Sequence, residues 1–167
     1  SGGLDAAGGA AALFPALLRV TAPAGRVVLA EAHSRRAQRL YRLLDWSARP
    51  ELQERLAARL ETAEEAIYSG AGERLGPEPE TVRVAALAAG FEAAQLTTRN
   101  VTTPQRLSTA LVESWFRGGA ARPSYADLIG GSFSGEELAE LRSLFVTQLA
   151  ESERPWTSTL YLLQLTA

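Results

Sequence analysis

The pattern of apolar and polar positions along the chain predicts three strands separated by helical segments. The first strand is expected at 26–31, where the run VVLA contains no polar residue, as is typical of a strand buried on both faces of a parallel sheet. A second strand, at 91–100, has mixed polarity and suits an edge, whereas a third, at 157–166, has an apolar middle and suits the centre. The sequence therefore predicts a small mixed sheet in which 157–166 lies between the other two strands.

A first helical block is predicted at 34–70. Ser34 is expected to cap a helix in which Leu40 and Leu44 lie on one face. A second helix is predicted to begin near Pro50, because proline is well tolerated in a first helical turn. The apolar residues that follow recur at helical spacing and are expected to face the core: Leu52, Leu56, Leu60, Ala63 and Ile67.

A second helical block is predicted at 104–150. Pro104 is expected to begin a helix that carries Leu107, Leu111 and Trp115 on one face. Further along, the sequence SGEE from residue 134 has the form of a capping box, with serine at the N-cap and glutamate three residues later. The helix that this box opens is expected to bury the following residues: Leu138, Leu141, Phe145 and Leu149.

Two shorter helices complete the expected order of elements. One lies before the sequence APAG at 22–25, which fits a type I turn with proline at its second position and glycine at its fourth. The other runs from Pro79 to Gly90, and glycine suits the left-handed position that ends a helix.

Length and composition fit one globular domain covering 1–167. The chain has 167 residues, a net charge of −2 and no cysteine or methionine. The lack of cysteine excludes disulfides, thiolate nucleophiles and cysteine-based zinc sites, and no apolar run approaches the roughly 20 residues that a membrane-spanning helix needs. A negative net charge gives no general attraction for nucleic acid or an anionic membrane. We therefore expect a cytoplasmic protein without a membrane partner and without direct contact to nucleic acid.

Three segments together resemble the C-terminal half of a class I S-adenosylmethionine-dependent methyltransferase. LFPALLRVTAPAGRVVLAE is similar to the helix, turn and fifth strand of that family, VRVAALAAGFEAAQL to the helix and sixth strand, and TSTLYLLQLTA to the seventh strand. The resemblance implies a Rossmann-like α/β fold in which the seventh strand runs antiparallel between the fifth and sixth. It also implies that the cofactor is held by the other half of the domain. No cofactor-binding residue is therefore expected in this chain, and S-adenosylmethionine is implied only for the complete domain.

A narrower resemblance concerns the helical blocks. RLYRLLDWSARPELQERLAARLETAEEAIYSG and LRSLFVTQLAESERPWTSTLYLL are similar to segments of the methyltransferase-like region that some bacteria append to the RarA-type AAA+ ATPase of replication-associated recombination. This resemblance implies an alternative function, a non-catalytic docking or assembly module at the C-terminus of a larger ATPase. The expected partner is the missing N-terminal half of the parent protein or a second copy of the chain.

The candidate site residues are Glu31 and His33, which follow the first predicted strand. Ligands of open α/β sheets bind at the carboxyl ends of strands, so both side chains are expected to face a substrate crevice. His33 could act as a general base, because the ordinary pKa of histidine lies near neutrality. The alternative is an exposed histidine beside a helix cap. Because His33 is the only histidine, no metal site is expected.

A second group of ionisable residues lies within the first helical block. Glu61, Glu64 and Glu65 fall within about one turn of a predicted helix, a spacing that would allow acid–base or metal chemistry. Arg55 and Arg59 lie close by in the sequence. The pattern therefore predicts a solvated face of mixed charge.

Overall fold

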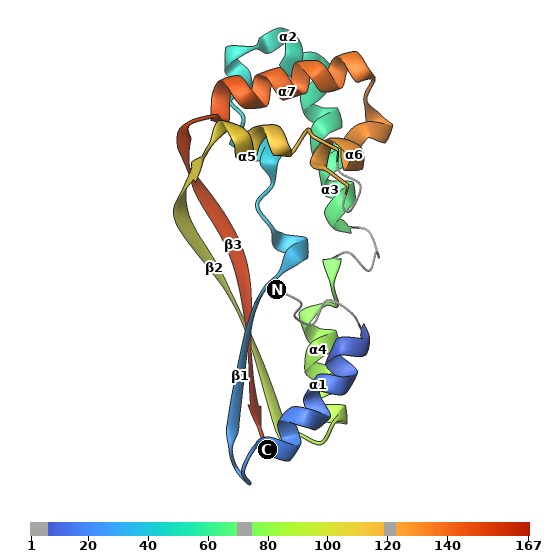
Figure 1. Ribbon diagram of the computed structural model, residues 1–167, viewed down its shortest axis with the longest axis vertical. Coiled ribbons are helices and arrows are strands. Elements are labelled where there is room, and N and C mark those ends of the chain that lie inside the picture. Colours follow the sequence, from blue (N-terminus) through green and yellow to red (C-terminus); the bar gives the residue numbers. More distant parts are fainter. Residues whose placement is uncertain (1–6, 70–74, 119–122) are drawn as a thin grey trace. The chain divides into compact units, whose positions relative to one another are not determined.

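The chain forms two compact units (Figure 1). The computed structural model describes residues 7–69, 75–118 and 123–167. The sheet unit consists of Ser1–Ala37, Ala71–Val101 and Thr157–Ala167, and the helical unit of Gln38–Gly70 and Thr102–Trp156. Two long strands contribute residues to both units.

Three strands form one sheet, β1 (Arg26–Ala32), β2 (Ala93–Leu107) and β3 (Ser152–Thr166). Their order is β1-β3-β2, so the prediction that the last strand lies in the middle is confirmed. Neighbouring strands are antiparallel, and the register of β1 on β3 runs from Arg26 opposite Thr166 to Ala32 opposite Leu160. The expected mixed sheet is therefore wrong for the described strands, because each pairing between neighbours is antiparallel.

The expectation that β1 is buried on both faces is also wrong. Its side chains alternate between exposed and half-buried, and Val28 is 61% exposed. Val27 and Leu29 point to the other face and pack on the core of the sheet unit. An antiparallel sheet often has one face on a core and one in solvent. The unbroken apolar run arose because the open face of β1 also carries apolar residues.

Two helices cover the packed face of the sheet, α1 (Ala7–Val20) and α4 (Pro79–Ala88), and they lie side by side in Figure 1. Between helices and sheet, Phe14 meets Phe91 edge-to-face, with ring centroids 6.4 Å apart. This geometry is favourable for aromatic pairs. The remaining buried members of this core come from α4 and β3: Val82, Ala86, Leu163 and Leu165.

Glycine and alanine shape the ends of these two helices. Gly90 follows α4 with a φ of 108°, as expected for the residue that terminates a helix. In the turn before β1, the Gly25 N–H donates to the Ala22 carbonyl at 2.8 Å. Ala24, however, has a φ of 58°, and a positive φ at the third position belongs to a type II turn. The expected type I turn is therefore wrong.

The first part of the helical unit is less regular than its spacing predicted. In place of one helix after Ser34, the chain forms short 3₁₀ turns at Ser34–Arg36, Leu40–Leu43 and Trp46–Ala48, of which the first belongs to the sheet unit. The side chain of Ser34 caps no helix. The amides of residues 40 and 41 donate to a glutamate side chain and not to carbonyls of the preceding turn. A competing side-chain acceptor thus replaces the helical ladder.

The helix expected from Pro50 is confirmed, with one irregularity. It comprises α2 (Pro50–Leu52), a π-helical turn at Gln53–Ala57 and α3 (Ala58–Ser69). The expected stripe faces the core, with these members buried: Leu52, Leu56, Leu60 and Ala63. Periodicity therefore located the helix but gave no sign of the π-helical turn.

The second part of the helical unit contains α5 (Thr109–Ser114), α6 (Tyr125–Ile129) and α7 (Gly135–Leu149). The helix expected at Pro104 is wrong, because β2 continues to residue 107 and α5 begins only after Ser108, whose side chain accepts from a backbone N–H of the first turn. Proline is tolerated on an edge strand. The capping box at the start of α7 is confirmed, and the box that opens α6 was not predicted. None of the described helices combines the length and apolarity needed to cross a membrane.

Candidate functional site

The two predicted site residues lie in the sheet unit, where β1 ends. Glu31 is opposite Tyr161 of β3 in the strand register, and His33 follows two residues later. Both line a small pocket together with Tyr161 and with residues of the loop before α4; its complete lining is Glu31, Ala32, His33, Ser34, Leu75, Gly76, Pro77 and Tyr161. The structure therefore brings Glu31 and His33 together at one depression.

Tyr161 is the residue that links the two predicted side chains. Its hydroxyl donates to Glu31 Oε2 at 2.8 Å, and its ring lies edge-on to the His33 ring with centroids 6.4 Å apart. Tyr161 is only 3% exposed, so its position is fixed by packing. A hydroxyl held in this way fixes the orientation of the Glu31 carboxylate.

His33 also lies near Glu78, a residue that the sequence pattern did not indicate. His33 Nε2 lies 3.8 Å from one carboxylate oxygen of Glu78, and Arg35 Nε lies 2.7 Å from the other. The His33 side chain is 10% exposed. Burial lowers the pKa of His33, Glu78 raises it, and Arg36 and Arg35 lower it, with a net shift below the ordinary value of 6.5. The imidazole is therefore neutral at pH 7 and can accept a proton.

The backbone around Glu78 explains how a loop residue reaches this position. Gly76 has a φ of 68°, a conformation that favours glycine, and Pro77 and Pro79 fix φ on either side of Glu78. α4 then begins at Pro79. The signal that could have identified Glu78 was the sequence GPEP, in which a carboxylate is flanked by two prolines after a glycine.

The glutamates of α3 form a second ionisable cluster, in the helical unit. The prediction of a solvated face is wrong for Glu64, which is 0% exposed. Its carboxylate accepts bonds from the Leu40 N–H at 2.5 Å, the Tyr41 N–H at 2.9 Å and the Tyr125 hydroxyl at 2.7 Å. Burial is the main cause that raises the pKa of Glu64, against these hydrogen bonds. With three donors from two segments, the Leu40–Leu43 turn and α6, Glu64 is a structural acceptor.

The pocket beside His33 is too small for S-adenosylmethionine. The space among Glu31, His33 and Tyr161 is about 20 Å³, enough for about one water molecule. A pocket of about 360 Å³ in the helical unit has a floor of Leu52 and Leu144 and is otherwise lined by these residues: Ala48, Arg49, Glu140, Ser143, Thr147 and Gln148. Its glutamate is paired with an arginine. The cofactor does not fit the first pocket, and no group of three or more metal-ligating side chains occurs in the part of the chain that the structure describes.

Comparison with known proteins adds no further assignment. No family model matches this chain, and no curated protein matches it.

Proposed function

We propose that this chain is the C-terminal part of an S-adenosylmethionine-dependent methyltransferase-like domain whose cofactor-binding half lies outside the chain. The observation that supports the proposal is the position of β3, which runs antiparallel between β1 and β2. This is the arrangement that the resemblance to the last three strands of that family implies. The helices α1 and α4 precede β1 and β2, as they do in the resembling segments.

Within this proposal, the end of β1 supplies the side of the site that faces the methyl acceptor. Glu31 and His33 lie at the carboxyl end of a strand, where ligands of α/β sheets bind. The neutral imidazole of His33 can take a proton from an acceptor hydroxyl or amine, and the Glu78 carboxylate, 3.8 Å from Nε2, favours the protonated form. The cofactor, when bound by the complete domain, supplies the methyl group.

The alternative function is a non-catalytic docking or assembly module at the C-terminus of an AAA+ recombination ATPase. The observation that favours it is the small size of the pocket beside His33, which has room for about one water molecule. In addition, the Glu31 carboxylate is already engaged by Tyr161. A site of this kind can persist as a structural remnant after catalysis is lost.

Calorimetric titration with S-adenosylmethionine separates the two functions. This chain alone is expected to bind it no more tightly than a dissociation constant of about 100 μM, or about 5.5 kcal/mol. The protein encoded by the complete gene is expected to bind it more tightly, and the exchange His33→Ala should leave that affinity unchanged because His33 holds no cofactor. Tight binding by the chain alone would contradict the proposal, and absence of binding by the complete protein would favour the docking module.

A further inference from the structure

The outer edge of β1 carries open backbone groups. The His33 N–H donates to the Thr159 carbonyl, and the Ala167 N–H donates to the Gly25 carbonyl. With the observed register, odd-numbered residues of β1 therefore direct N–H and C=O toward β3. The even-numbered residues direct theirs outward, and among the described residues no strand lies on that side: Arg26, Val28, Ala30 and Ala32.

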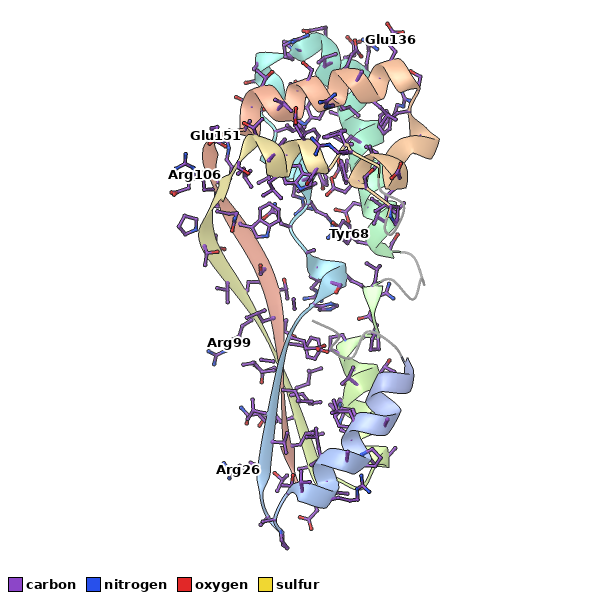
Figure 2. The ribbon with its side chains drawn as sticks, viewed as in Figure 1. Arg26, Tyr68, Arg99, Arg106, Glu136 and Glu151 are labelled. Carbon is purple, nitrogen blue, oxygen red and sulfur yellow. The ribbon has the colours of Figure 1, made fainter. Side chains whose placement is uncertain are left out.

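The two edges of the sheet differ in their protection. β2, the other edge strand, carries exposed Arg99 in the sheet unit, and its continuation in the helical unit carries Pro104 and exposed Arg106; the two arginines are labelled in Figure 2. Proline and charged side chains are the usual means by which edge strands avoid pairing. On β1 the open face carries one charge, Arg26, at the first residue of the strand (Figure 2). The edge of β1 is therefore the one that is suited to accept another strand.

We propose that this edge pairs with β1 of a second copy of the chain, antiparallel and about a two-fold axis at Leu29. In this register Val28 lies opposite Ala30 of the second copy, and Arg26 lies opposite Ala32 of the second copy. It is the register in which all four open residues of each strand face open residues of the other, so each can exchange both backbone hydrogen bonds. At each of the two central pairs, the larger Val28 side chain of one copy lies opposite the smaller Ala30 side chain of the other.

Charge and burial agree with a second copy as the partner. The two Arg26 residues would lie six residues apart along the paired strands, or roughly 20 Å at about 3.4 Å per residue. This exceeds the screening length of about 8 Å at physiological salt, so their repulsion is weak. The exposed Val28 would be covered in part, and the half-buried Leu160 and Leu162 of β3 would continue the same apolar face.

Sedimentation at micromolar concentration tests this inference. The chain is expected to be a dimer, and Ala30→Pro is expected to be a folded monomer, because the lost N–H points outward and takes no part in the pairing with β3. Val28→Lys should weaken the dimer, whereas Val20→Lys, at a position 81% exposed on α1, should leave it intact. A wild-type chain that is monomeric although its circular dichroism shows it to be folded would overturn the inference.

The lack of cysteine allows a direct test of the register. Leu29 would face itself across the axis as a non-hydrogen-bonded pair, with Cα atoms about 4.5 Å apart, within the range of roughly 4.4–6.8 Å for disulfides. Leu29→Cys is therefore expected to give a disulfide-linked dimer under mild oxidation. Val27→Cys, on the same face but facing residue 31 of the second copy, is expected to give far less. Equal yields, or linkage of Val27→Cys alone, would overturn the register.

The inference goes beyond the proposed function and concerns this chain by itself, because in a complete methyltransferase-like domain a strand of the other half would pair with the same edge. The two proposals can still fail separately. A monomeric chain would leave the cofactor titration of the complete protein unaffected. Conversely, a complete protein that binds no S-adenosylmethionine would leave the sedimentation result of this chain unchanged.

Discussion

The sheet unit and the helical unit are stabilised in different ways. Among the described residues, the buried core of the sheet unit has six members, all on one face of the sheet, whereas that of the helical unit has fifteen and is shared by α3, α5, α6 and α7. The helical unit is also tied by ion pairs between helices, such as Arg55 with Glu140 and Arg59 with Glu137. Within the part of the chain that the structure describes, the sheet unit leaves one face of its sheet open, and β1 and β2 each have one edge without a neighbouring strand. The difference shows that several helices share the core of the helical unit, whereas the sheet unit is packed on one face of its sheet.

Two natural probes report on the two units separately. All three tryptophans, Trp46, Trp115 and Trp156, belong to the helical unit, and the single histidine, His33, belongs to the sheet unit. Tryptophan fluorescence therefore follows the helical unit, and the imidazole proton resonances follow the sheet unit.

The largest expected effect comes from emptying each core in turn. Phe145 is fully buried and contacts the rings of Trp115 and Phe116, so Phe145→Ala should lower the free energy of unfolding by about 3–5 kcal/mol. Phe14→Ala should cost a similar amount in the sheet unit. In thermal unfolding, Phe145→Ala should shift the fluorescence transition more than the His33 resonances, and Phe14→Ala the reverse. Equal shifts of both probes in both variants would contradict the separation of the units.

Removal of the buried carboxylate tests the polar part of the helical unit. Glu64→Ala leaves the Leu40 and Tyr41 amides and the Tyr125 hydroxyl without their acceptor. Because an unsatisfied buried group costs about 1–3 kcal/mol, we expect a loss of about 2–3 kcal/mol in urea unfolding followed by fluorescence. Glu61→Ala is the matched control one turn earlier on α3, with an exposed side chain, and should change stability by less than about 0.5 kcal/mol. Similar losses in both variants would refute the structural role of Glu64.

A pH-dependent effect is expected at the start of α7. Arg59 is the main cause that lowers the pKa of Glu137 to about 2, with help from the Ser134 N–H. A carboxylate with a lowered pKa in the folded state stabilises the fold above its ordinary pKa of 4.5, and this contribution is lost as the pH falls toward 2. As the pH falls from about 5 to about 2, the melting temperature of the helical unit should fall more in the wild type than in Glu137→Gln. If the melting temperatures of both proteins fell equally with pH, the ion pair of Arg59 with Glu137 would contribute nothing to stability.

The smallest expected effect concerns the turn that leads into β1. Ala24 adopts a φ of 58°, which strains a residue with a side chain, so Ala24→Gly should stabilise the sheet unit by up to about 1 kcal/mol. Gly25→Ala should destabilise it, because the added Cβ would lie 2.6 Å from the Ala22 carbonyl oxygen and 2.7 Å from Thr21 Cγ2. Thermal unfolding followed at His33 measures both. If Gly25→Ala raised the melting temperature and Ala24→Gly lowered it, the result would contradict the observed turn.

The sequence predicted those parts of the fold that depend on local pattern. The capping box at Ser134, the helix after Pro50 and the central place of 157–166 follow from local spacing or polarity, and each is confirmed. The helices expected after Ser34 and at Pro104 failed because distant groups or a neighbouring strand satisfy those backbones in another way.

The candidate site was predictable only in part. Glu31 and His33 were found because they end a strand, which is a local signal. Tyr161 and Glu78 were not predicted, because β3 and the loop before α4 come close to Glu31 and His33 only in the folded chain. Glu64 illustrates the same limit, because nothing in its helical spacing indicates that three donors surround it.

Glu78 and His33 lie close together at the end of β1, and a titration of His33 by proton NMR measures how strongly Glu78 acts on the imidazole. As the single histidine, His33 gives unambiguous resonances. The pKa of His33 is expected below the ordinary value of 6.5. It should fall further in Glu78→Gln, because this exchange removes the carboxylate that raises it. It should stay unchanged in Glu80→Gln, because the Glu80 carboxylate pairs with Arg83. A His33 that titrates at its ordinary value and does not respond to Glu78→Gln would contradict the account.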